Sequence, residues 1–125
     1  METFKEAEVL YAKTRLQWRR WLAKHGQKKT EVFLILHNRN STQKSVAYEE
    51  AIEEALCYGW IDSVSNKRDH ESRYQRFSPR KPGSKWSQSN RDRVARLIKE
   101  GLMTGHGQKT IDIAKERGTW NVTTG

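Results

Sequence analysis

The stretch WIDSVSNKRDHESRYQRFSPRKPGSKWSQSN, residues 60–90, determines how the predicted elements of this chain are joined. WIDSVS at its start is predicted to be a strand, and RYQRFS, residues 73–78, is predicted to return as the second arm of a hairpin. The polar NKRDHES between them is typical of a hairpin turn. Proline fixes its own φ and keeps the preceding residue out of helical conformation, so the second strand is expected to stop at Pro79.

The segment that follows the hairpin is predicted to be an elbow between a strand and a helix. Residues 76–90, RFSPRKPGSKWSQSN, contain both prolines of the chain. Helix-capping residue types end the segment, at Ser87, Ser89 and Asn90. Apolar residues at helical spacing then predict a helix that ends near Gly101.

Apolar periodicity predicts the remaining elements on either side. EVFLILH, residues 31–37, is too short for a typical helix and rich in strand formers, so we expect a buried central strand. The other expected elements are a strand at residues 8–12 and helices over residues 14–26, 48–58 and 104–117. In the second of these helices, the acidic side chains are expected to face solvent: Glu49, Glu50, Glu53 and Glu54.

These elements predict an α+β fold, with a small antiparallel sheet of three to four strands packed with about four helices. A length of 125 residues suits one domain that spans residues 1–125. Only 34% of the residues are hydrophobic, but five of them are tryptophans, so the core is expected to be rich in aromatic side chains.

The formal net charge of +9 is concentrated in two blocks, residues 1–30 and residues 61–100. Such an excess favours acidic partners by long-range attraction, which include acidic small molecules, acidic protein surfaces and nucleic acids. No apolar run approaches the ~18 residues of a membrane helix, and the N-terminus lacks the apolar block of a signal peptide. We therefore expect a cytoplasmic protein without membrane insertion. The single cysteine, Cys57, fits a reducing compartment and is expected to be a buried thiol.

Motifs for catalysis, metal binding or cofactor binding are not found in the sequence. The four histidines show no metal-type spacing with each other or with Cys57, and no phosphate-loop or dinucleotide motif occurs. We therefore expect neither a metal nor a cofactor, and an enzyme acting on an acidic substrate ranks last among the candidate functions.

The elbow is the strongest candidate site, because basic residues converge on it beside Trp86: Arg76, Arg80, Lys81, Lys85 and Arg91. In one interpretation the elbow is structural, with Arg76 or Arg80 paired to Asp62 on the facing strand while Trp86 seals the core. In the other, the arginines and the start of the following helix receive an anion. Strand alternation places Asp62 on one face with Trp60 and Val64, between two apolar neighbours.

Three segments resemble the YdeI or OmpD-associated family, often labelled bacteriocin-protection proteins: EEALCYGWIDS (53–63), RYQRFSPRKPGSKWSQSNRDRVARLIKEGLMT (73–104) and AKERGTW (114–120). RLQWRRWLAKH and EVFLIL also match the beginning of that family, so the resemblance covers nearly the whole chain. It implies a small bacterial cytosolic α+β protein associated with envelope stress or protection from bacteriocins. The chain has Ser63 where the family typically has glycine and Gly105 where it has proline.

The residues that match the family's motifs form the candidate site: Trp60, Asp62, Arg76, Pro79, Arg80, Ser84, Trp86, Ser87 and Asn90. We expect Arg76 and Arg80 to grip an anionic group while Asp62 orients one guanidinium. The tryptophans would wall the pocket, and Ser87 and Asn90 would cap the helix or donate to the ligand. The leading hypothesis is therefore a non-enzymatic module that binds an acidic ligand or partner. The alternative is non-specific nucleic-acid binding through surface bases such as Lys28, Lys29 and Arg68.

Overall fold

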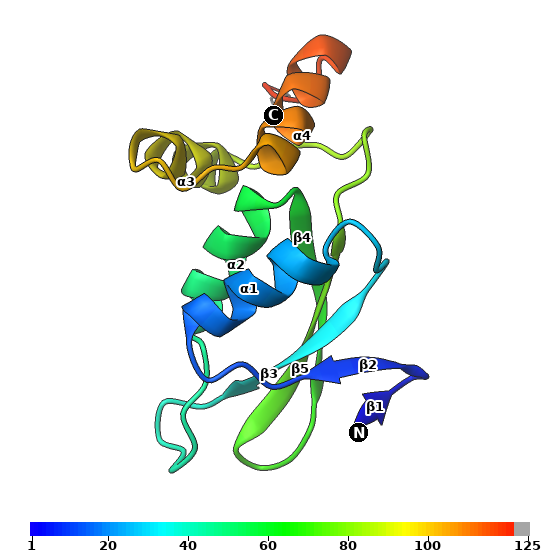
Figure 1. Cartoon of the computed structure of the whole chain (residues 1–125), viewed down its shortest axis with the longest axis vertical. Coiled ribbons are helices and arrows are strands. Elements are labelled where there is room, and N and C mark those ends of the chain that lie inside the picture. The colour runs from blue at the N-terminus through cyan, green and yellow to red at the C-terminus, as the bar shows by residue number, and fades with distance from the viewer. Residues whose placement is uncertain (122–125) are drawn as a thin grey trace.

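A sheet carries two helices on one face, and two further helices pack beyond one end of it (Figure 1). The computed structural model describes residues 1–121 of the chain. Its elements are β1 (Thr3–Phe4), β2 (Ala7–Leu10), α1 (Arg15–His25), β3 (Val32–His37), α2 (Tyr48–Cys57), β4 (Trp60–Lys67), β5 (Ser72–Pro79), α3 (Gln88–Lys99) and α4 (Gly105–Arg117). Within those residues, every helix is too short or too polar to span a membrane.

The sheet has five strands in the order β1-β2-β3-β5-β4, so the α+β class is confirmed but the predicted sheet was too small and too uniform. β2 runs parallel to β3 because α1 connects them, whereas the other neighbours pair antiparallel. β1 was missed because it has only two residues. It joins β2 through Lys5 and Glu6, both of which have positive φ without the glycine that usually signals such a turn.

β3 is the central strand that the apolar run 31–37 predicted. Val32, Leu34 and Leu36 face α1 and α2, where Trp18 and Trp21 belong to the same buried cluster. Phe33 and Ile35 belong to a second cluster on the opposite face, against which Phe4 of β1 packs. Both faces of the strand are therefore covered, which explains its nearly continuous hydrophobic sequence.

The predicted hairpin is formed by β4 and β5, but the alternation along β4 is broken. Asp62 pairs with Phe77 and Ser65 pairs with Gln75, so a bulge lies between Asp62 and Ser65. The Gln75 side-chain amide donates to the carbonyl oxygens of Ser63 (3.1 Å) and Val64 (3.3 Å) inside this bulge. The prediction that Val64 shares a face with Asp62 was wrong, and Val64 is 55% exposed.

Two of the four α2 glutamates expected in solvent are buried instead. Glu53 is 8% exposed and Glu54 is 3% exposed. Glu54 accepts hydrogen bonds from Arg15 (2.5 Å) and Arg19 (2.8 Å) of α1, and Glu53 pairs with Arg15 and Arg96. The periodicity of α2 showed only its apolar face, while the arginines that make burial of the carboxylates tolerable lie far away in the sequence.

The elbow joins β5 to α3 as predicted. β5 ends at Pro79, and the Ser87 hydroxyl accepts a hydrogen bond from the Asn90 backbone (3.1 Å) at the start of α3. Trp86 is buried and lies against Trp120, with ring centroids 5.0 Å apart. The elbow and the segment after α4 therefore pack together beside α3.

α4 begins in close contact with the end of α2. A Cβ added at Gly107 would lie only 2.5 Å from the Cys57 carbonyl oxygen and 2.6 Å from that of Leu56. A side chain at this position would force the two helices apart, so glycine permits the approach that brings α4 over the start of β4. The Thr104 hydroxyl, which caps α4, also donates to the Cys57 carbonyl.

Candidate anion-binding pocket

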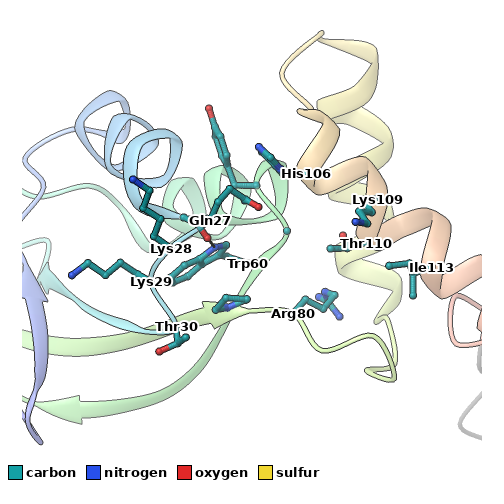
Figure 2. Close-up of a pocket in the computed structure, with 14 residues that line it drawn as sticks. Gln27, Lys28, Lys29, Thr30, Trp60, Arg80, His106, Lys109, Thr110 and Ile113 are labelled. Atoms are coloured by element: carbon teal, nitrogen blue, oxygen red, sulfur yellow. Dashed lines mark hydrogen bonds between the residues drawn. The ribbon is translucent and has the colours of Figure 1, made fainter.

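A cavity of about 390 Å³ lies where the α1–β3 loop, the start of β4, the end of β5 and α4 meet. We call it the basic pocket. It is lined by Gly26, Gln27, Lys28, Lys29, Thr30, Tyr58, Gly59, Trp60, Pro79, Arg80, His106, Lys109, Thr110 and Ile113. Figure 2 shows the loop residues on one side, the α4 residues on the other and Arg80 between them.

The lining contains cationic side chains and no aspartate or glutamate. Lys28, Lys29 and Lys109 lie at the surface, and Arg80 is half-buried. Lys29 pairs with Glu8 outside the pocket at 3.5 Å. Within residues 1–121, Lys28, Lys109 and Arg80 make no ion pair. The pocket is therefore a concave region of positive potential that an anion would neutralise.

The elbow folds back to hold Arg80 in this pocket. The Arg80 backbone donates to the Gly59 carbonyl (2.9 Å), which ties the end of β5 to the start of β4. The guanidinium carbon lies 3.9 Å from the centroid of the Trp86 ring, and Nη1 donates to the Ser84 hydroxyl (2.9 Å). The Nε atom is buried and has no hydrogen-bond partner in the part of the chain that the structure describes. Arg80 is thus positioned by neutral groups only.

Burial makes the Arg80 charge costly. Desolvation lowers the pKa of Arg80 to about 10, and Asp62, which forms no ion pair with Arg80 in the described residues, only partly opposes this effect. The guanidinium still carries its proton at neutral pH. The lowered pKa therefore reflects burial of a charge that no nearby carboxylate neutralises.

Two of the glycines that line the basic pocket, Gly59 and Gly26, allow neighbouring segments to approach closely. Gly59 has a φ of +77°, and a Cβ there would lie 2.9 Å from the Thr110 methyl group, so this turn approaches α4 closely. Gly26 accepts a hydrogen bond from the Trp60 indole (3.0 Å), and a Cβ at Gly26 would lie 2.5 Å from the Leu22 carbonyl oxygen. Trp60 is only 1% exposed, so it contributes almost no accessible surface to the cavity that it lines.

A family model described as "Domain of unknown function (DUF8412)" matches residues 10–110, which is most of the chain. The chain belongs to the DUF8412 family. Comparisons with curated proteins and with solved structures gave no match. The matched range of the DUF8412 domain extends from β2 into α4 and includes every basic residue that lines the pocket.

The structure brings part of the sequence-predicted site together in this DUF8412 chain. Trp60, Pro79 and Arg80 line the basic pocket. Ser84 and Trp86 do not line it, but both hold the Arg80 guanidinium. Ser87 and Asn90 lie at the start of α3, where the Asn90 side-chain oxygen accepts a hydrogen bond from Arg93 (2.8 Å). Their polar groups therefore serve the helix terminus.

Arg76 and Asp62 lie outside the basic pocket. Arg76 pairs with Glu31 at 3.2 Å, and its Nη1 lies 3.3 Å from the hydroxyls of Ser63 and Ser78. Asp62 accepts a hydrogen bond from the Tyr48 hydroxyl at 2.6 Å. Neither elbow arginine forms the expected ion pair with Asp62 among the described residues. For Arg76 the reason is that it points to the opposite face of the hairpin from Asp62, which pairs with the neighbouring Phe77.

The residues from α4 were not predicted as part of a site. His106, Lys109, Thr110 and Ile113 recur at helical spacing, which places them on one face of a helix. That spacing was visible in the sequence, but it could not show that this face meets the loop after α1. The close contacts of Gly59 and Gly107 determine the meeting, and they are properties of the folded chain.

Proposed function

We propose that this protein is a non-enzymatic binding module that takes a phosphate or carboxylate group of a small acidic ligand into the basic pocket. The observation that carries the proposal is the half-buried Arg80 side chain, which lines a cavity without acidic residues, has a buried Nε atom without a hydrogen-bond partner and makes no ion pair among residues 1–121. A buried cation without a counter-charge is unfavourable. A bound anion would supply the missing charge and accept a hydrogen bond from the guanidinium.

The other basic residues extend the same role. Lys28 belongs to the loop side of the cavity and Lys109 to the α4 side, and Thr110 of α4 also lines it (Figure 2). Their charges would attract the ligand, while Arg80 would fix its orientation, because a guanidinium can donate two parallel hydrogen bonds. The sequence predicted that Arg76 and Arg80 together bind the anionic group. We now propose that Arg80 binds it with these lysines.

The size and walls of the pocket suit a ligand larger than an inorganic anion. A volume of about 390 Å³ lies within the usual range for small-molecule sites. Pro79 and Ile113 provide apolar surface beside the charged groups. We therefore propose a small metabolite with an acidic group at one end and a less polar body.

The biological setting that we propose follows the sequence resemblance. Kinship with the YdeI or OmpD-associated proteins would place the protein in the cytoplasm of a bacterium, in a response to envelope stress or bacteriocins. Burial of the unpaired Cys57 is compatible with a reducing compartment. In this setting the basic pocket would report or sequester an acidic metabolite.

Thermal unfolding in the presence of acidic ligands tests the proposal. Phosphate, pyrophosphate, citrate and sugar phosphates would be screened, and a true ligand raises the melting temperature progressively as its concentration exceeds Kd. Calorimetry on Arg80→Met and Lys109→Ala should then show weakened binding. Arg76→Ala is the matched control, because it removes an elbow arginine outside the basic pocket. Equal losses in Arg76→Ala and Arg80→Met, or no stabilisation by any anion, would contradict the proposal.

A further inference from the structure

A second, larger cavity lies at the opposite end of α2. It has a volume of about 730 Å³ and lies between the loop after β3, the start of α2 and β5. We call it the loop pocket. Its residues include Lys13, His37, Arg39, Lys44, Tyr48 and Arg73. This loop and the β4–β5 turn lie at the end of the molecule away from α3 and α4 (Figure 1), and the Asn38 backbone donates to the Glu71 carbonyl (2.7 Å) between them.

The loop pocket is also positively charged. Lys13, Arg39, Lys44 and Arg73 make no ion pair within residues 1–121. The one acidic residue that lines it, Glu49, is engaged by Arg93 through hydrogen bonds of 2.7 and 3.0 Å. These bonds hold the pKa of the Glu49 carboxyl below its usual value. The pocket therefore keeps four cations available to a ligand.

An exposed aromatic ring distinguishes the loop pocket from the basic pocket. Tyr48 is 40% exposed, whereas Trp60 is buried. The Tyr48 hydroxyl is fixed by Asp62 (2.6 Å), and the Arg73 guanidinium lies 5.1 Å from the ring centroid. The ring is thus held at two points, so a planar group could stack on it at little cost in side-chain entropy. The buried Arg73 Nε has no hydrogen-bond partner in the described part of the chain.

A fixed aromatic ring in a cavity that is also lined by lysines and arginines is an arrangement that suits nucleotide units, because bases stack on the ring while phosphates meet the cations. We propose that the loop pocket binds such a unit, with its base against Tyr48 and its phosphate near Lys44, Arg39 and Arg73. This is a site separate from the basic pocket and does not depend on the function proposed there. The unit has two sources, a free mononucleotide or a single-stranded nucleic acid.

Fluorescence anisotropy with a labelled mononucleotide and a labelled short oligouridylate tests this site. Replacement of the ring in Tyr48→Leu should weaken binding about ten-fold, whereas Tyr48→Phe keeps the ring, loses only the hydroxyl bond to Asp62 and should weaken binding by a smaller factor. Lys44→Ala should weaken binding and lower the salt dependence for the oligonucleotide by about one phosphate contact. Lys99→Ala, an exposed lysine of α3 outside the loop pocket, controls for net charge.

The two sources of the nucleotide unit predict different results. If the natural ligand is a single-stranded nucleic acid, the oligonucleotide should bind more tightly than the mononucleotide, and its affinity should fall steeply with salt. If the natural ligand is a free nucleotide, the two probes should bind with equal affinity. Arg80→Met should leave either kind of binding unchanged, which separates this site from the basic pocket. Absence of binding by both probes at low salt, or equal losses in Tyr48→Phe and Tyr48→Leu, would overturn the proposal.

Discussion

Replacement of Arg80 by methionine should separate the stability of the fold from the affinity of the basic pocket. Burial lowers the pKa of Arg80 to about 10, well below the ordinary value of a guanidinium. At 1.36 kcal/mol for each pKa unit, holding this charge in the folded protein costs about 3 kcal/mol. The Arg80 charge therefore destabilises the folded protein at every pH below about 10, because the unfolded chain holds the proton more tightly than the folded protein does.

The contacts of Arg80 offset most of this cost. A desolvated cation over an indole ring contributes about 2 kcal/mol, and the hydrogen bond to Ser84 contributes about 1 kcal/mol. Methionine is unbranched, and its sulfur packs favourably beside Trp86. We therefore expect the free energy of unfolding of Arg80→Met to lie within about 1 kcal/mol of the wild type, despite the loss of a half-buried residue.

Affinity for the acidic ligand should behave differently. A hydrogen bond from a buried charged donor contributes about 1.5–3 kcal/mol, so the dissociation constant should rise roughly 10- to 100-fold. Urea denaturation measures the first quantity and titration calorimetry the second, with Arg76→Ala as the reference variant. Destabilisation of the unliganded protein by more than about 3 kcal/mol, with unchanged affinity, would refute the reasoning and show that Arg80 is part of the scaffold.

Three further results are expected. The hydrogen bonds from Arg68 and Tyr74 lower the pKa of Glu2 to about 2. The contribution of the Glu2 carboxylate to stability is therefore present above about pH 4.5 and is lost as the pH falls toward 2. The melting temperatures of the wild type and Glu2→Gln should converge over that range. Partial burial and the bond to Asp62 raise the pKa of Tyr48 to about 12. The contribution of the neutral Tyr48 hydroxyl to stability is therefore present below about pH 10 and is lost as the pH rises through 12. In a spectrophotometric titration, the rise in phenolate absorbance near pH 12 should be smaller in Tyr48→Phe than in the wild type, by the amplitude of one tyrosine. Gly59→Ala combines a positive φ with a clash against α4, and chemical denaturation should show destabilisation of about 1–3 kcal/mol.

Local physical chemistry was sufficient to predict most elements of the fold. The two prolines predicted where β5 ends, and a capping serine stands at the start of α3 as expected. β1 was missed because two residues carry no periodicity, and the bulge in β4 was missed because the Gln75 side chain that occupies it belongs to the facing strand. Both depend on pairing between strands, which alternation along one strand does not reveal.

The candidate site was predicted only in part for a related reason. The sequence showed that Arg80 and Trp86 belong to one rigid elbow, and the elbow does hold the guanidinium. It could not show that Lys109, on a helix far along the chain, lies at the same cavity. Nor could it show that Arg76, four residues from Arg80, points to the other face of the sheet and pairs with Glu31. Proximity in the sequence was therefore a poor guide to proximity of charge.

The distribution of ion pairs gives the net charge of +9 a more specific meaning. Arginines in α1 and α3 are largely occupied by carboxylates of α2, as Arg15 and Arg19 are by Glu54. Arg68 is likewise occupied by Glu2. These side chains hold helices and the N-terminus together, so they contribute little free charge to binding.

The cations without carboxylate partners in the described chain include those at the two ends of α2, where the basic pocket and the loop pocket lie. Binding of anions through net charge alone would not require this division between paired arginines and unpaired cations at the pockets. Salt titrations of ligand binding should therefore follow the few residues of each pocket and not the net charge of the chain.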